Sequence, residues 1–330
     1  MKHSTMAWTT GLLFISVLLL MLGCGVGSQG WENPHTWWID PVSQHIFWEI
    51  RVPRNLGAWI GGALLGLAGA VAQGLFRNPL ADPYLLGSSA GASLGVSLYL
   101  SAWGGSLLSM AALGRLGITG TAFLGAMVAV GLTVLLSRGM QHTLRLLLAG
   151  VVVGVVVAAL ASLVAFREPQ MWQTLQAFLL GSAAMLDQTS CLLMGAVLVL
   201  CWLVSTAWAR VLDALNLGED TARSLGMPLS WASWGLIGAM SLATGTAVAH
   251  MGLIAFIGLA APHAVRSTVR ASHSSLLLLS VLMGGVLLLA SDIWARLAWA
   301  PEELPVGVLT SVLGGGYLLW RLHRTAGGHI

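Results

Sequence analysis

The chain has 330 residues, of which 57% are hydrophobic and only 8% are charged, and its mean hydropathy is +0.84. A soluble domain carries about 25% charged residues, so this composition excludes a soluble globular protein. The 15 Lys and Arg against 12 Asp and Glu leave a net charge of +3. In so apolar a chain, this excess is typical of loops that set membrane topology rather than of nucleic-acid binding. We therefore expect one transmembrane domain over residues 1–330 and no nucleic-acid partner.

The cysteines and histidines do not have the spacing of a metal site. Cys24, Cys191 and Cys201 lie in apolar runs without a CxxC pair, and an odd number of cysteines argues against a disulfide framework. We interpret them as small buried hydrophobic side chains. The nine histidines are scattered along the chain. The sequence therefore predicts no metal site and no cofactor bound by this chain.

The N-terminal hydrophobic run has two interpretations. Lys2 followed by the apolar residues 8–22 resembles a signal peptide, and the residues just before Cys24 loosely resemble a lipoprotein cleavage site. Because the rest of the chain is equally hydrophobic, we favour a first membrane helix that is retained.

Helices that cross a membrane need about 20 apolar residues to span about 30 Å of hydrocarbon. The sequence predicts an all-α integral membrane protein with about ten such helices, at residues 7–26, 54–76, 88–103, 117–137, 144–166, 188–208, 229–249, 253–268, 275–298 and 305–323. The eighth span contains Gly258 and Pro262. Since interrupted helices are tolerated only where protein or a water-filled cavity covers the backbone, we expect this span inside the bundle.

The positive residues orient the bundle. With the N-terminus inside and ten crossings, ten Lys and Arg fall on the inner side and five on the outer side, as the positive-inside rule requires. Both termini are therefore expected in the cytoplasm. The five outer residues are Arg51, Arg54, Arg115, Arg167 and Arg296.

Small residues recur at every fourth position on several spans, a pattern that lets helix backbones approach closely. The clearest stripes are Gly62, Gly66, Ala70 and Gly74, then Gly87, Gly91 and Gly95, and then Gly150, Gly154, Ala158 and Ser162. For most of these positions we expect helix packing rather than ligand binding.

Groups that could drive transport or catalysis are scarce in this sequence. Asp292 precedes Arg296 by four residues, a spacing that favours an ion pair on one helix face. An ion-coupled secondary transporter needs a buried coupling site, for which Asp292 is the candidate. An intramembrane enzyme would need a Ser/His or Asp/Asp pair at matching depth, and none is evident in the sequence. No GxxxxGK[ST] phosphate loop is present either, so this chain is not expected to hydrolyse ATP itself. We therefore favour a non-catalytic permease that receives its energy from another protein.

Four segments occur in an order that is specific for one family. They are RVPR at 51–54 with QGLFRNPLADPYLLG at 73–87, GEDTARSLG at 218–226, GLIAFIGLAAPHAVR at 252–266 and ELPVGVLT at 303–310. Together they resemble the permease subunits of type II ABC importers for iron chelates (siderophores and haem) and cobalamin. The resemblance covers about residues 45–323 and implies a fold of ten helices.

The resemblance also implies partners. Such permeases form homodimers or pseudo-dimers in the bacterial inner membrane, bind two copies of a cytoplasmic ATPase that uses ATP and Mg²⁺, and receive ligand from a periplasmic binding protein. The loop 209–228 matches the segment that fits a cleft on the ATPase, although a merely solvated loop is the alternative. Its coupling residues would be Gly218, Glu219, Ala222, Ser224, Leu225 and Gly226.

On the outer side, Arg51 and Arg54 match family arginines that receive glutamates of the binding protein, and Arg296 lies where a third is expected. Arginine suits this role because its planar guanidinium can donate two hydrogen bonds to one carboxylate. The alternative for Arg51 and Arg54 is that they extend toward the membrane interface. The alternative for Arg296 is a structural pair with Asp292.

The resemblance further assigns a gate, a pathway and a substrate class. The cytoplasmic gate would comprise Asn78, Pro79, Leu80, His142 and Thr143. The pathway would lie between two subunits, and small residues of the fifth helix would line it with a smooth wall, at Gly150, Gly154, Ala158 and Ser162. The substrate is expected to be a bulky iron–siderophore complex, because iron chelates are frequent ligands of the family, with haem or cobalamin as alternatives.

Overall fold

The computed structural model describes residues 2–27, 30–31, 40–103, 112–137, 143–167 and 169–326. Ten of its helices correspond to the ten expected spans, which confirms the predicted fold class. They are α1 (Lys2–Gly25), α4 (Val52–Leu75), α5 (Ser88–Trp103), α6 (Ala112–Leu136), α7 (Thr143–Phe166), α9 (Gln188–Ala207), α12 (Leu229–Met251), α13 (Ile257–Thr268), α14 (His273–Leu297) and α15 (Val306–Ala326).

Shorter elements connect these helices. They are β1 (Val26–Gly27), β2 (Gly30–Trp31), α3 (Pro41–Ile46), the π-helix η1 (Phe47–Arg51), the 3-10 helix η2 (Pro83–Leu86), α8 (Pro169–Leu180), α10 (Ala209–Leu215) and α11 (Glu219–Ser224). β1 and β2 pair antiparallel. α3, η1 and α8 were not predicted from the sequence, because they are shorter than an apolar run that can cross the membrane.

Seven helices of the described chain are long and apolar enough to cross a membrane by length and composition. The other three of the ten are α5 and α13, with 16 and 12 residues, and α15, whose described apolar part is short. The expected eighth span is helical only from Ile257, because residues 252–256 are irregular. Most of α13 is buried, which confirms that this interrupted span lies inside the bundle.

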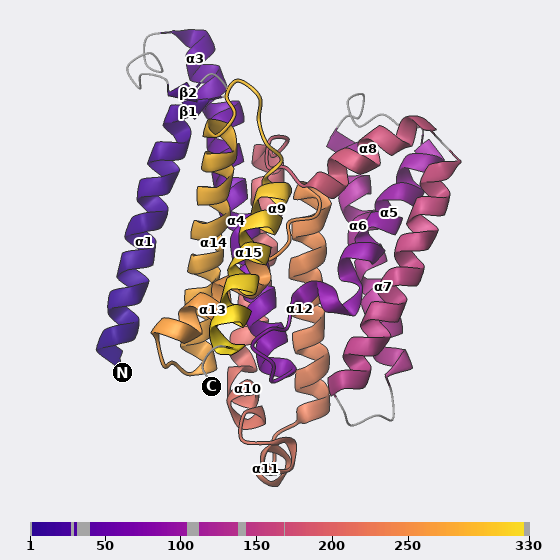
Figure 1. Cartoon of the computed structure of the whole chain (residues 1–330), viewed down its shortest axis with the longest axis vertical. Coiled ribbons are helices and arrows are strands. Elements are labelled where there is room, and N and C mark those ends of the chain that lie inside the picture. Colours follow the sequence, from indigo (N-terminus) through magenta and orange to yellow (C-terminus); the bar gives the residue numbers. More distant parts are fainter. Residues whose placement is uncertain are drawn as a thin grey trace.

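The helix α4 is the core of the bundle, and α1 lies at its edge. In the apolar windows of these two spans, 89% of the α4 window is buried against 17% of the α1 window. α4 packs against α14, α12, α13 and α9. In Figure 1, α1, α14 and α13 lie on one side, α5, α6, α7 and α8 on the other, and α12 stands between them.

Glycines of α4 permit this close packing. A side chain at Gly62 or Gly66 would collide with the backbone carbonyls of Gly284 and Ser280 on α14, and one at Gly69 would collide with Gly258 on α13. The backbones can approach only because these Cβ atoms are missing. The predicted small-residue stripe on the second span is therefore a packing surface.

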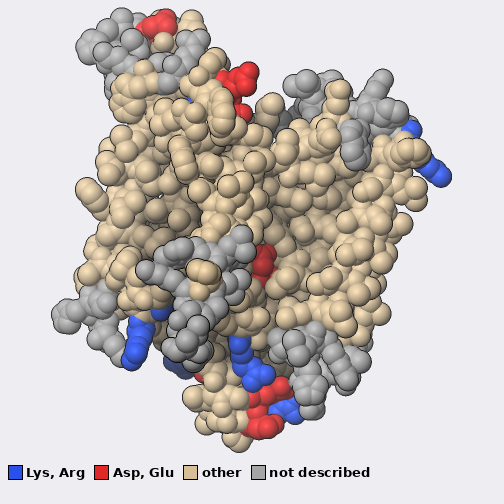
Figure 2. Space-filling view, viewed as in Figure 1, with Lys and Arg blue, Asp and Glu red and all other residues tan. Residues whose placement is uncertain are grey.

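The two ends of the bundle differ. α3 and α8 lie at one end, while α11 projects from the other end, where α1 begins and α15 ends (Figure 1). We refer to these as the α3 end and the α11 end. Figure 2 shows most visible charged groups near these two ends, with an almost uncharged face between them and one acidic group at mid-height.

A glycine substitution tests the α4–α14 contact. Ala normally stabilises a helix by about 1 kcal/mol relative to Gly, but Gly66→Ala places its methyl against the Ser280 carbonyl, and such overpacking costs about 1–3 kcal/mol. We expect Gly66→Ala to lower the thermal unfolding midpoint in detergent. The matched control is Gly238→Ala on α12, where nothing lies within 4 Å of the added carbon. A midpoint for Gly66→Ala equal to or above that of Gly238→Ala would contradict this packing.

Candidate functional site

A cluster of charged side chains ties α4, α14 and the α14–α15 loop together at the α3 end. Arg54 on α4 donates through Nη2 to Oδ1 of Asp292 at 3.1 Å and through Nη1 to Oε2 of Glu303 at 2.8 Å. Nη2 of Arg296 lies 3.0 Å from Oδ2 of Asp292. Both oxygens of Asp292 are thus held by arginines, which confirms the expected pair between Asp292 and Arg296.

Arg296 is a buried anchor of this cluster. Its side chain is only 2% exposed, and its guanidinium donates to the backbone carbonyls of Gly23 and Val26 at 3.1 and 2.8 Å and to Oδ1 of Asn55 at 2.7 Å. These contacts join the end of α1 to α4 and α14. In this arrangement Arg296 has no surface for a partner's carboxylate, so its placement matches the structural alternative.

Arg51 lies one turn before Arg54, at the end of η1. Its Nη1 donates to the carbonyl of Cys24 at 3.2 Å, and its own carbonyl accepts from Nδ2 of Asn55 at 2.7 Å. Arg51 and Arg54 are both largely buried, which differs from side chains that extend freely toward the interface. The structure brings all three predicted docking arginines together at one end of the bundle.

The predicted coupling segment forms a small projection at the α11 end (Figure 1). Gly218 and Gly226 bracket α11 with backbone φ angles of 110° and 72°, which side-chain-bearing residues rarely adopt. Within it, Glu219 and Arg223 pair at 2.7 Å, and Ser224 Oγ donates to the carbonyl of Thr221. α11 is therefore a short helix bounded on each side by a glycine in a conformation with positive φ.

Ala222 and Leu225 of this projection differ in their exposure to solvent. Ala222 is fully buried, and the Leu225 side chain is exposed. α11 packs on α10, so Ala222 fixes α11 to the bundle, whereas Leu225 presents an apolar group outward. An exposed Leu next to the charges of Glu219 and Arg223 suits a contact with another protein.

A pair that the sequence analysis missed joins this projection to α14. The carboxylate of Asp213 on α10 accepts from the backbone N–H of His273 at 2.9 Å and lies 2.7 Å from Nδ1 of the same residue. His273 is the first residue of α14, the helix that carries Asp292 and Arg296 near its other end. α14 thus connects the α11 end directly to the charged cluster at the α3 end.

The first half of the predicted gate is a tight turn after α4. Asn78 caps it, because its Oδ1 accepts from the backbone N–H of Leu80 at 3.0 Å and its carbonyl accepts from that of Ala81 at 3.0 Å. Pro79 and Leu80 are exposed. The second half stays a prediction, since His142 lies outside the described residues, as does the side chain of Thr143 at the start of α7.

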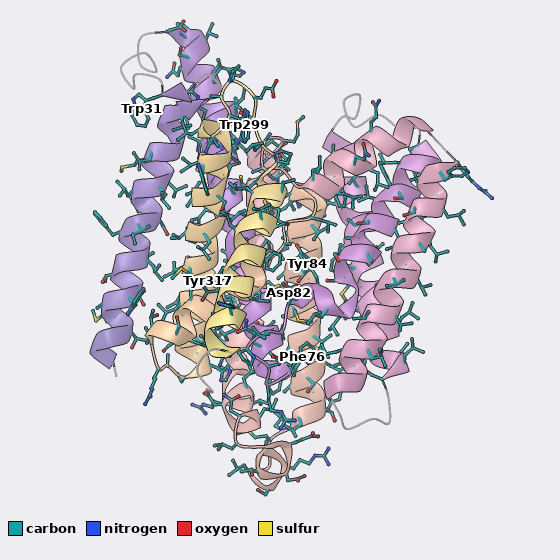
Figure 3. All side chains as sticks on the ribbon, in the orientation of Figure 1. Trp31, Phe76, Asp82, Tyr84, Trp299 and Tyr317 are labelled. Carbon is teal, nitrogen blue, oxygen red and sulfur yellow. The ribbon has the colours of Figure 1, made fainter. Side chains whose placement is uncertain are left out.

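An acidic residue that the sequence analysis passed over lies at mid-height of the bundle. Figure 3 shows Asp82 and Tyr84 at this height. Asp82 Oδ1 accepts from the backbone N–H of Tyr84 at 2.8 Å, and Tyr84 donates its hydroxyl to the carbonyl of Ile254 at 3.1 Å. Asp292 is therefore not the only membrane-level carboxylate. The two irregular segments, before α5 and before α13, meet here.

The predicted pathway stripe on α7 divides into two parts. A side chain at Gly150 would collide with the carbonyl of Leu85, and Gly154 lies against Gly87. These two glycines therefore pack within the chain, against η2 and Gly87, and their place in a pathway stays a prediction. Ala158 and Ser162 are exposed, and their place in a pathway between subunits stays a prediction.

The thiols form no disulfide among the described residues; Cys191 and Cys201 are buried, as expected, and Cys24 is partly buried. Across the part of the chain that the structure describes, no group of three or more His, Cys, Asp or Glu could hold a metal ion. The arrangement offers contact surfaces at two ends and a helical bundle between them.

Comparisons with known proteins agree with this arrangement. The model of the FecCD transport family matches residues 12–324. Among curated proteins, the vitamin B12 import system permease protein BtuC of Klebsiella pneumoniae is 37% identical over 322 residues, which cover 97% of this chain and 94% of the relative. BtuC of Escherichia coli O157:H7 is 36% identical over 323 residues, with 97% and 96% covered.

Solved structures show the same fold. A chain of an ABC transporter of metal-chelate type, in an inward-facing conformation, superimposes with a TM-score of 0.84 at 29% identity and covers 96% of this chain and 98% of its own. PsaBC from Streptococcus pneumoniae, in complex with Fab, gives a TM-score of 0.60 at 17% identity, covering 86% and 92%; at that identity the likeness concerns the fold alone. With a family match across nearly its whole length and relatives above one third identity, the chain belongs to the FecCD transport family.

Proposed function

We propose that this chain is the membrane permease of an ATP-driven importer that carries a bulky metal chelate into the cell. The observation that carries the proposal is the FecCD match over residues 12–324, joined to a bundle whose charged groups gather at its two ends. Permeases of this family are not catalytic, and ATP is hydrolysed by a separate subunit in such systems.

The two ends take different partners in this proposal. The Arg51–Arg54 region at the α3 end receives a periplasmic binding protein, and the α11 projection fits an ABC ATPase, of which two copies bind ATP and Mg²⁺. A second permease copy completes the pathway, most simply as a homodimer. The chain lies in the bacterial inner membrane with both termini in the cytoplasm, which agrees with the start of α1 and the end of α15 lying at the α11 end.

Two chelates compete as the substrate. The BtuC relatives, at 36–37% identity, are named for vitamin B12 import, which supports cobalamin. The structural neighbour is an ABC transporter of metal-chelate type. An iron chelate, either a siderophore complex or haem, is therefore the second candidate. The pathway wall does not discriminate between them, since the exposed positions of α7 are mainly Val and Leu.

Uptake in cells tests this choice. We expect a strain that lacks its own cobalamin permease to regain cobalamin-dependent growth when this chain is produced together with its ATPase and binding protein. Excess ferric siderophore should then leave cobalamin uptake unchanged. Growth that returns only for ferric siderophore or haem would reject cobalamin in favour of the second candidate, and growth on none of the three would reject the proposed substrate class.

The ion-coupled alternative has a clear discriminator. A secondary transporter would draw on a membrane-level carboxylate such as Asp82 or Asp292, but Asp292 is neutralised by Arg54 and Arg296. Uptake that continued after loss of the ATPase subunit would favour this alternative over the importer.

A further inference from the structure

The two carboxylates that bind Arg54 differ in their exposure to solvent and in their number of partners. Asp292 is 1% exposed, whereas the Glu303 side chain is 28% exposed. Asp292 lies on α14 and also pairs with Arg296. Glu303 belongs to the irregular loop 298–305 between α14 and α15 and reaches Arg54 through the single contact of Oε2 with Nη1. Asp292 is therefore held by two arginines, whereas Glu303 pairs with Arg54 alone among the described ion pairs.

Only Glu303 can therefore be exchanged. Withdrawal of Asp292 would leave the buried guanidinium of Arg296 without its counter-ion, and an unpaired buried charge is strongly destabilising. Withdrawal of Glu303 moves one partly exposed carboxylate into water, where it is well solvated, and leaves Arg54 with Asp292. Partly exposed ion pairs contribute little because water competes with them.

Charge balance leads to the same residue. Arg54 and Arg296 carry two positive charges, which Asp292 and Glu303 balance with two negative charges. A third carboxylate brought to Arg54 by another protein would place three negative charges against the two guanidinium groups of Arg54 and Arg296. If that carboxylate takes the place of Glu303 on Nη1, the balance is kept.

We propose that Glu303 is an internal competitor for the acidic side chain of the binding protein. In the free permease it occupies the position on Arg54 that the incoming carboxylate needs, and docking is an exchange of one carboxylate for another. The exchange releases the loop 298–305 from α4. Because this loop leads directly into α15, docking is transmitted to the start of α15. This inference rests on the proposed function, because it presupposes that the binding protein docks at the α3 end.

The test compares two neighbouring glutamates. Glu303→Gln removes the competing charge, and Glu302→Gln removes an equal charge at an exposed residue for which the described structure has no ion pair. The binding affinity is measured for the binding protein encoded with this permease, loaded with cyanocobalamin, against the whole permease–ATPase complex in lipid nanodiscs. If Glu303 occupies Arg54 for about 90% of the time, its removal raises the competent fraction about tenfold. We expect the dissociation constant to fall by about tenfold for Glu303→Gln and to stay within about twofold for Glu302→Gln.

Two outcomes of these measurements would contradict the role of Glu303. If Glu303→Gln binds no more tightly than Glu302→Gln, Glu303 is not a competitor and the inference is overturned. Should Glu303→Gln lower the unfolding midpoint of the complex, Glu303→Asp replaces it, since the shorter side chain keeps the charge but cannot reach Arg54; it too must bind more tightly than wild type. Failure of docking itself shows separately, because charge reversal at Arg54 would then leave binding unchanged.

Discussion

Charge reversal at Arg54 is expected to weaken docking of the binding protein by about 100-fold or more, because loss of one partner of a desolvated charge pair costs about 2–5 kcal/mol and the new carboxylate also repels its counterpart. Arg54→Glu would further face Asp292 and Glu303, the two acids that Arg54 now binds. The measurement is the dissociation constant of the binding protein for the permease–ATPase complex, together with substrate uptake.

A control must separate docking from folding, since Asp292 would keep only Arg296 among its present partners. Arg167→Glu reverses an exposed charge outside the cluster, after α7, and should leave affinity within about twofold. Arg51→Glu is the second docking variant and should also weaken binding. Each variant must still bind the ATPase, which shows that the bundle is folded. Unchanged affinity and uptake in both Arg51→Glu and Arg54→Glu would contradict docking at the α3 end.

Substitution of Leu225 by Glu is expected to abolish ATP-driven uptake while the bundle stays folded. Leu225 is 58% exposed on the α11 projection, so its replacement creates no cavity within the chain. A charge placed in the apolar centre of a protein interface removes a contact that commonly contributes 2 kcal/mol or more, about a 30-fold loss of affinity. Copurification of the ATPase with the permease measures the effect directly.

The matched control adds the same charge at the other end. Val42 on α3 is exposed to a similar degree, and Val42→Glu should leave ATPase copurification unchanged. If Leu225→Glu retained the ATPase as well as Val42→Glu does, α11 would not be its docking element. The coupling residues Gly218, Glu219, Ala222, Ser224 and Gly226 would then need another role.

Hydrophobicity alone predicted the spanning helices well. The bounds of α5 agree with the expected 88–103, and α9 and α14 begin within two residues of expectation, because a long apolar run has no stable alternative in a membrane. Short elements escaped this reasoning. α8 has 12 residues and η1 has five, and neither is long enough to be distinguished from a loop by length and hydropathy.

Long-range contacts account for what the sequence could not show about the site. The i,i+4 pair of Asp292 and Arg296 was visible in the sequence, but the carbonyls of Gly23 and Val26 that bury Arg296 lie about 270 residues earlier. Similarly, Asp82 stands between Pro79 and Pro83, as a loop residue would. Its position at mid-height depends on the contact of Tyr84 with Ile254, which no local pattern encodes.

ATP-dependent accumulation in proteoliposomes is the most direct test of the central claim, that this chain is a permease without catalysis of its own. Vesicles containing the permease and its ATPase, supplied with loaded binding protein, should accumulate cyanocobalamin only with ATP and Mg²⁺, and a sodium or proton gradient should not replace ATP. The account also predicts no accumulation when the ATPase is omitted. Accumulation driven by an ion gradient through the permease alone would contradict it.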